Sequence, residues 1–177
     1  MNILPVVFAD GSDFYKALAS TYITHRKGLF ILAPSGAGKT YFCQNQSSKH
    51  WIDGDELWFG AKAHPEGPWW KEPVSVMRRV DQRCDVLTSE AMEQGFWIMG
   101  ASNQWLKPSA IVIPEWEAHK ENIRKREQTN YDGGATAADF DQVLGHMEWI
   151  KKWHTEHGVP MFATIEAAVE ALTPDSM

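Results

Sequence analysis

The sequence predicts an α/β fold in which a parallel β-sheet is flanked by helices. Short apolar runs of strand length alternate with segments whose apolar residues recur at helical spacing, which is the pattern of repeated strand and helix units. One of these runs leads into a glycine-rich turn and then directly into a segment with helical character. With 177 residues, the chain is expected to form a single domain spanning residues 1–177.

Five apolar runs have the length expected of buried strands. Runs of four to eight residues rich in branched and aromatic side chains, and bounded by turn residues, are typical of strands in parallel sheets. The predicted strands are Gly28–Leu32, His50–Asp53, Phe96–Met99, Ala110–Ile113 and Val159–Ala163. A candidate edge strand, Ile3–Phe8, precedes them.

Two long helices are predicted from periodicity. Pro73–Gln94 repeats apolar residues along one helix face and is followed by Gly95, a residue that commonly ends helices. Thr136 is expected to cap the second helix with the help of Asp139, and Gly158 to end it. The predicted buried positions are Val80, Cys84, Leu87 and Ala91 in the first, and Phe140, Val143, Leu144, Met147 and Ile150 in the second.

Four shorter helices complete the prediction. The segment 115–128 carries acidic residues in its first turn and basic residues near its end, the charge order favoured by the helix dipole. Thr164 can cap the last helix. The predicted ranges are Phe14–Thr24, Thr40–Ser47, Glu115–Gln128 and Thr164–Leu172.

Charge and composition exclude several classes of protein. A net charge of -6 argues against a strong non-specific DNA binder. The sequence has no uncharged apolar run of about 18 residues and no signal-peptide pattern, so we expect a cytoplasmic protein with no membrane partner, in the host cytoplasm if it is viral. Cys43 and Cys84 form no CxxC motif, which favours neither a disulfide framework nor a zinc site. No obligate protein partner is inferred.

The strongest motif is the turn at residues 33–40, which read APSGAGKT. Phosphate loops need glycines followed by Gly-Lys-Ser/Thr between a strand and a helix, because backbone N–H groups must wrap a phosphate at the helix N-terminus. Ala33 replaces the usual first glycine, which is acceptable if residue 33 keeps a negative φ. The expected nucleotide contacts are Ser35, Gly36, Ala37, Gly38, Lys39, Thr40 and Tyr41, with Lys39 on the β- and γ-phosphates and Thr40 on Mg²⁺.

A second acidic motif follows the second predicted strand. Asp53-Gly54-Asp55 is expected at the carboxyl edge of the sheet, where open α/β sheets bind ligands. Phosphoryl transfer to a hydroxyl requires a carboxylate that orients the acceptor, and a further carboxylate can serve the metal. We assign Asp53 to the acceptor or the metal, and Asp55 to the acceptor hydroxyl. The alternative is a tight turn in which an aspartate binds its own backbone.

These motifs in this order resemble the P-loop class of nucleotide and small-molecule kinases, especially those that phosphorylate hydroxyls, such as gluconate and adenylylsulfate kinases. The resemblance implies a three-layer fold with a five-stranded parallel sheet in the order 2-3-1-4-5, an ATP-Mg²⁺ donor and an arginine-bearing lid at about residues 120–136. Arg124, Lys125 and Arg126 match the lid by position, and Arg124 and Arg126 are the candidate catalytic cations. A solvated helix end is the alternative. The third strand lacks the aspartate of a Walker B motif, which disfavours GTPases and motor ATPases.

The segment from Trp58 to Arg83 occupies the place where such kinases hold their acceptor. Aromatic faces stack on nucleobases at about 1–3 kcal/mol each, and guanidinium groups bind phosphates. The candidate acceptor-binding residues are Trp58, Trp69, Trp70, Arg78, Arg79 and Arg83. The alternative is that the tryptophans are core residues and the arginines a solvated helix face.

The whole chain also resembles small bacteriophage kinases that phosphorylate 5-hydroxymethyl-deoxyuridine within DNA. That resemblance implies hydroxymethylated DNA as the acceptor, with the target base flipped out of the stack. Two alternatives remain: a deoxynucleoside monophosphate kinase, and a nucleotide-binding switch module without an acceptor.

Overall fold

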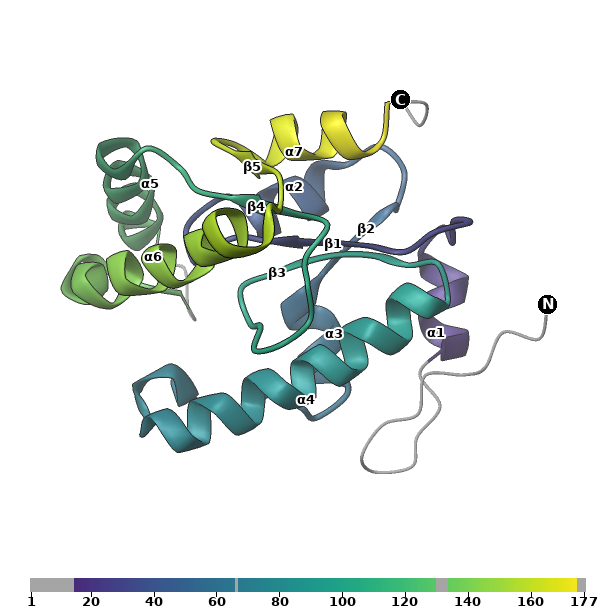
Figure 1. Ribbon diagram of the computed structural model, residues 1–177, viewed down its shortest axis with the longest axis horizontal. Helices are drawn as coiled ribbons and strands as arrows, with labels where there is room; N and C mark the ends of the chain where they lie inside the picture. The colour runs from purple at the N-terminus through teal and green to yellow at the C-terminus, as the bar shows by residue number, and fades with distance from the viewer. Residues whose placement is uncertain (1–14, 66, 130–133, 175–177) are drawn as a thin grey trace. The chain divides into compact units, whose positions relative to one another are not determined.

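A computed structural model describes residues 15–65, 67–129 and 134–174 of the chain (Figure 1). The candidate strand Ile3–Phe8 lies outside this range. Within it, no helix has both the length and the apolar character required to span a bilayer. The elements, in order, are α1 Tyr15–Thr21, β1 Leu29–Leu32, α2 Lys39–Asn45, β2 Trp51–Asp53, α3 Gly54–Gly60, η1 Trp69–Lys71, α4 Val74–Glu93, β3 Trp97–Gly100, β4 Ala110–Val112, α5 Trp116–Gln128, η2 Ala137–Asp139, α6 Phe140–His157, β5 Met161–Phe162 and α7 Ile165–Leu172.

The five strands form one parallel sheet in the order β2-β3-β1-β4-β5, flanked by helices. This confirms the predicted fold class and strand order. In the register of the sheet, Asp53 at the end of β2 lies opposite Met99 of β3, and Leu32 at the end of β1 lies opposite Ile111 of β4. The four residues of β1 are all buried, as are those of β3, because strands within such a sheet are covered on both faces.

The chain divides into two compact units, described separately below. The first contains the described residues of 15–30 and 43–106, and the second contains residues 31–42 and 107–174. The boundary falls within β1, so that strand contributes residues to both units.

In the first unit, α3 and α4 pack on β2 and β3 (Figure 1). The four predicted apolar positions of α4 are all buried, which confirms its helix face. Gly95 follows the helix with a φ of 86°, and a Cβ there would lie 2.1 Å from the His25 carbonyl oxygen. Only glycine fits both the conformation and the space, so the helix ends where the sequence predicts.

In the second unit, α6 and α7 pack against β4, and α5 and α6 share an apolar cluster (Figure 1). Ile123 of α5 packs there with Val143 and Met147 of α6. Leu144, which was predicted to be buried, is 38% exposed. It follows Val143 directly, and the core-facing stripe of α6 is narrower than the predicted set of five residues.

Several predicted boundaries shift by a few residues. The Thr136 backbone N–H and hydroxyl both donate to Asp139 Oδ2, at 2.9 and 3.1 Å, which confirms the predicted capping pair, although a short 3₁₀ turn precedes α6. Gly158 adopts the left-handed conformation at the end of α6, as predicted. The last strand contains only Met161 and Phe162 rather than five residues.

Candidate phosphate-binding site

The turn between β1 and α2 contains two glycines in the left-handed region of φ. Gly36 and Gly38 both have positive φ values, 83° and 96°, which favour glycine. The Ala37 N–H donates to the Pro34 carbonyl at 3.3 Å, and the Phe42 N–H donates to the Gly38 carbonyl at 2.9 Å. Residues 34–38 therefore form a compact turn that leads directly into α2.

The two glycines are required for different reasons. A Cβ on Gly36 would lie 2.7 Å from Ile123 Cγ1 and 3.1 Å from His119 Nε2, so α5 packs directly against the loop at this point. A Cβ on Gly38 would meet no atom of the described chain within 4 Å. Gly38 is therefore required for its backbone conformation alone.

Lys39 is folded back into the loop. Its side chain is only 7% exposed, and Nζ donates to the carbonyl oxygens of Ala33 and Pro34, at 3.0 and 2.7 Å. Lys62 is the only described non-glycine residue with a positive φ. Ala33 therefore has a negative φ. This is the condition that the sequence analysis set for an alanine at this position.

Ser35 links the loop to residues far along the chain. Its carbonyl oxygen lies 2.7 Å from His119 Nε2. Its Oγ accepts from Arg126 Nη2 at 3.4 Å and from the Ala135 N–H at 3.3 Å. Arg126 Nη2 also donates to the Ala135 carbonyl at 2.6 Å. Ser35 is thus contacted by His119 from the first half of α5, by Arg126 from its last turn and by Ala135 from the segment that follows.

His119 was not predicted from the sequence. The side chain is fully buried, and burial lowers its pKa, with a further lowering from the nearby charges of Lys39 and Arg126 and an opposing effect from the Ser35 hydrogen bond. The imidazole is therefore neutral at physiological pH. Because the Ser35 carbonyl can only accept, the proton of the neutral ring is assigned to Nε2, which leaves Nδ1 facing Met147 Sδ at 3.1 Å.

The three predicted lid cations have different surroundings. Arg126 reaches the phosphate loop through Ser35. The Arg124 guanidinium instead lies over the ring of Phe140, 5.2 Å from its centroid, and Lys125 pairs with Glu121 at 3.7 Å. Of the three, Arg126 is the one that the fold brings to the loop. Residues 130–133 of the predicted lid lie outside the described chain.

In the first unit, the acidic turn is also the start of a helix. Asp53 caps α3: its Oδ1 accepts from the Asp55 N–H at 3.1 Å. Asp53 therefore binds nearby backbone, which is the alternative that the sequence analysis named. Asp55 is exposed in the first turn of α3. Its charge acts on His64: burial lowers the pKa of this histidine, and the Asp55 charge raises it.

Trp58 was predicted to contact the acceptor, and the structure corrects this. Its side chain is fully buried, and its Nε1 donates to Thr88 Oγ1 at 2.9 Å. Gly54 and Gly100 leave room for the indole, since a Cβ on them would lie 2.7 and 2.1 Å from its ring. A side chain enclosed in this way is a core residue and cannot stack on a base.

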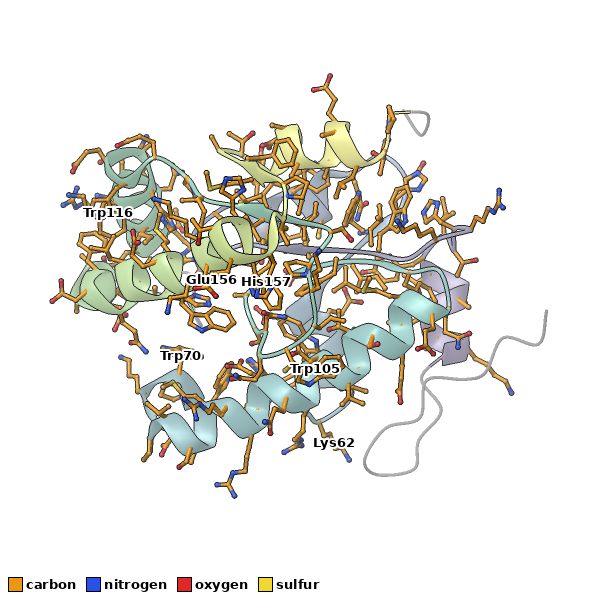
Figure 2. All side chains as sticks on the ribbon, viewed as in Figure 1. Lys62, Trp70, Trp105, Trp116, Glu156 and His157 are labelled. Carbon is orange, nitrogen blue, oxygen red and sulfur yellow. The ribbon has the colours of Figure 1, made fainter. Side chains whose placement is uncertain are left out.

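The other predicted acceptor residues differ in exposure. Trp69 is 9% exposed and donates from Nε1 to His64 Nε2 at 2.5 Å, so most of it is core as well. Trp70, labelled in Figure 2, is half-buried. Its ring meets that of Trp69 edge to face. Arg83 Nη2 donates to the Lys62 carbonyl at 2.5 Å. Arg78 and Arg79 lie exposed on α4.

A buried carboxylate, also absent from the sequence analysis, fixes the segment after β3. Asp85 of α4 is fully buried, and its Oδ2 accepts from three consecutive backbone N–H groups, those of residues 104–106, at 2.5 to 3.0 Å. Its Oδ1 accepts from Asn103 Nδ2 at 3.1 Å. Burial raises the pKa of Asp85, and these donors act to lower it. Trp105, half exposed, lies on the segment thus held (Figure 2).

Asp81 lies one helical turn before Asp85. Burial, with a smaller contribution from the Asp85 charge, raises the pKa of Asp81 to about 7, while a hydrogen bond with Ser102 acts in the opposite direction. The same surroundings raise the pKa of Cys84 well above its ordinary value, so this buried thiol is not activated as a nucleophile.

Comparison with protein-family models and with curated proteins returned no match. In the described part of the chain, no group of three His, Cys, Asp or Glu side chains is placed to hold a metal ion.

We predict that Asp85→Asn lowers the free energy of unfolding by about 3 kcal/mol. The amide oxygen of asparagine can still accept from the backbone N–H groups of residues 104–106, but its NH2 group would then face the donor Asn103 Nδ2. That mismatch leaves buried groups unpaired, each of which costs about 1–3 kcal/mol. Urea denaturation measures the loss. Glu93→Gln, an exposed change on the same helix, serves as the control and should have little effect. Equal stability of the two variants would contradict the role assigned to Asp85.

We predict that Asp81→Asn is more stable than the wild type at pH 8 and that the difference narrows as the pH falls towards 4. The folded protein holds the Asp81 proton up to about pH 7, whereas the unfolded chain releases it near its ordinary pKa. The wild type therefore loses stability from this group as the pH rises through that interval, and asparagine cannot. Denaturation of both proteins at pH 5, 6, 7 and 8 tests this, and parallel pH profiles would refute it.

Proposed function

We propose that the protein is an ATP-dependent kinase that transfers the γ-phosphoryl group to a hydroxyl of a nucleotide-type acceptor. The observation that supports this most is the turn at residues 33–40. It combines two glycines of positive φ, a lysine folded into the turn and the start of a helix directly after a buried strand of a parallel sheet. Such a loop presents backbone N–H groups to an anion at a helix N-terminus.

In this proposal the loop amides from Gly36 to Thr40 hold the phosphates. Lys39 Nζ exchanges a loop carbonyl, that of Ala33 or Pro34, for a phosphate oxygen. Arg126 gives up its contact with Ser35 in the same way and neutralises charge that develops on the transferred group. ATP would supply the phosphoryl group and Mg²⁺ would spread its charge, with the Thr40 hydroxyl as a protein group that would hold the ion. Asp53, the second predicted ligand of the ion, belongs to the other unit, and its assignment stays a prediction.

On the acceptor side, we assign Asp55 to the hydroxyl, which it orients and deprotonates. Trp70 and the exposed guanidinium groups of Arg78 and Arg79 support a nucleotide-type acceptor, because an aromatic face and two phosphate-binding groups lie in one segment of the chain. Hydroxymethylated uracil in DNA is our first choice. With Trp58 and Trp69 buried, this choice depends on fewer aromatic residues than the sequence analysis expected.

An acceptor screen with γ-labelled ATP separates the proposal from its alternatives. The panel contains free deoxynucleoside monophosphates, DNA with and without 5-hydroxymethyluracil, and gluconate. Label found only in the hydroxymethylated DNA supports the first choice, whereas label in free monophosphates supports a monophosphate kinase. Binding of ATP without transfer to any acceptor would favour a switch module, and the absence of both binding and transfer would overturn the proposal.

We predict that Lys39→Ala lowers the turnover number at least about 10²-fold while the fold is retained. The lysine would carry charge stabilisation that is made at the transferring phosphoryl group, and losses of this size are typical when one such group is removed. Turnover and circular dichroism are measured together. Lys151→Ala, an exposed change on α6, is the matched control. Near-normal turnover of Lys39→Ala would contradict the assignment.

We predict that Asp55→Asn lowers the turnover number about 10²-fold with little change in ATP affinity. An acceptor-orienting carboxylate acts in the transition state, so its loss affects turnover more than binding of the donor. Steady-state kinetics and calorimetric ATP titration provide the two values, with Asp141→Asn on α6 as the control. A collapse of ATP affinity instead would make Asp55 a metal-binding or structural residue.

A further inference from the structure

We propose that His119 is a positioning residue for the phosphate loop, which holds the peptide between Ser35 and Gly36 in the orientation needed to bind an anion. The contact that carries this is the hydrogen bond of 2.7 Å between His119 Nε2 and the Ser35 carbonyl. The ligand, a triphosphate, rests on the proposed function. The orientation of the peptide is a property of the loop itself and can be measured without a ligand.

The geometry of the peptide bond makes this contact decisive. The described chain has no cis peptide bonds, and in a trans peptide the C=O and the N–H point in opposite directions. A Ser35 carbonyl directed at His119 therefore points the Gly36 N–H away from α5. Reversing that peptide would direct the Gly36 N–H at α5 and present a carbonyl oxygen on the opposite side, where it would repel a phosphate.

The sequence of the loop makes such a reversal easy. A peptide flip changes ψ of Ser35 and φ of Gly36, and glycine accepts both signs of φ at low cost. The observed φ of 83° is thus one of two accessible values for Gly36. Selecting one of the two orientations requires a hydrogen bond that forms in only one of them. The bond from His119 to the Ser35 carbonyl is of this kind.

His119 is itself held in one position and one tautomer. It is fully buried, with Met147 Sδ 3.1 Å from Nδ1 and the Trp116 ring edge-on at 5.9 Å between centroids; Trp116 lies on α5 (Figure 2). Gly36 approaches so closely that a Cβ there would lie 3.1 Å from Nε2. A neutral imidazole suits this place, because it donates one hydrogen bond without adding a charge next to Lys39 and Arg126.

The alternative is a buried histidine that only fills space between α5 and α6. Both roles predict lower stability when the side chain is changed, so stability cannot distinguish them. What distinguishes them is the position of one donor. Glutamine can place its amide nitrogen near the position of Nε2, whereas the shorter asparagine places it near that of Nδ1 and cannot reach Ser35.

The test compares His119→Gln with His119→Asn and His119→Leu. Affinity is measured by calorimetry for ATP with Mg²⁺ and for inorganic tripolyphosphate, which has no base or sugar to bind elsewhere. We expect His119→Gln to stay within about 3-fold of the wild type, and the Asn and Leu variants to weaken both affinities about 10-fold or more. Lys151→Ala, an exposed change on α6, is the control and should bind like the wild type.

Urea denaturation of each variant shows that the compared proteins are folded, and crystal structures without nucleotide show the peptide directly. We expect the Ser35 carbonyl to keep its direction in His119→Gln and to be reversed or heterogeneous in His119→Leu. If Asn and Leu variants bind as tightly as Gln, or keep the peptide unchanged, His119 is not a positioning residue although the kinase proposal stands. If the wild type binds neither ligand, the kinase proposal fails, and the peptide orientation alone decides the inference about His119.

Discussion

The conformation of residues 34–38 is the constraint on which the candidate site depends. A chain that leaves a buried strand and enters a helix within a few residues must turn sharply, and here Gly36 and Gly38 do so with positive φ. At Gly36 the neighbouring helix leaves no space for a side chain, so backbone conformation and packing impose the same residue. Lys39 then begins α2 with its ammonium group on the carbonyls of the loop it has just left. Substitution at Gly36 would therefore disturb the turn, the packing of α5 and the surroundings of Lys39 together.

Much of the fold could be predicted from the sequence because the signals are local. Strands β1, β3 and β4 are continuous apolar runs, which is what burial on both faces requires, and α4 repeats its apolar residues at the helical period. The residues that were misjudged carry no such local signal. Trp58 has an aromatic side chain that could stack on a base. Its burial depends on Gly54 and Gly100, which make room for its ring in the folded structure. Aromatic content alone does not separate a binding surface from a core.

The two groups that the sequence analysis missed act over long distances in the chain. His119 and Ser35 are 84 residues apart, and Asp85 reaches the backbone of Trp105 20 residues later. Each replaces what a local motif would supply: His119 contacts the loop from a distant helix, and Asp85 satisfies a run of N–H groups that belong to no helix or strand. The sequence contained a weak signal for each group: an acid next to the buried Cys84, and a histidine within a predicted helix. These signals were too weak to identify a partner without the fold.

The distribution of charge within each unit explains how an acidic protein can contain an anion site. In the second unit, Lys39 and Arg126 lie together at the loop. Burial is the main cause of the lowered pKa of His119, and the charges of these two cations lower it further. In the first unit, burial is the main cause of the raised pKa values of Asp81 and Cys84, and neighbouring acids raise both further. The net charge of -6 is a sum over the whole sequence and does not describe the surroundings of the loop. An anion responds to the local potential at the loop rather than to that sum, because salt screens exposed charges beyond about 8 Å at physiological ionic strength.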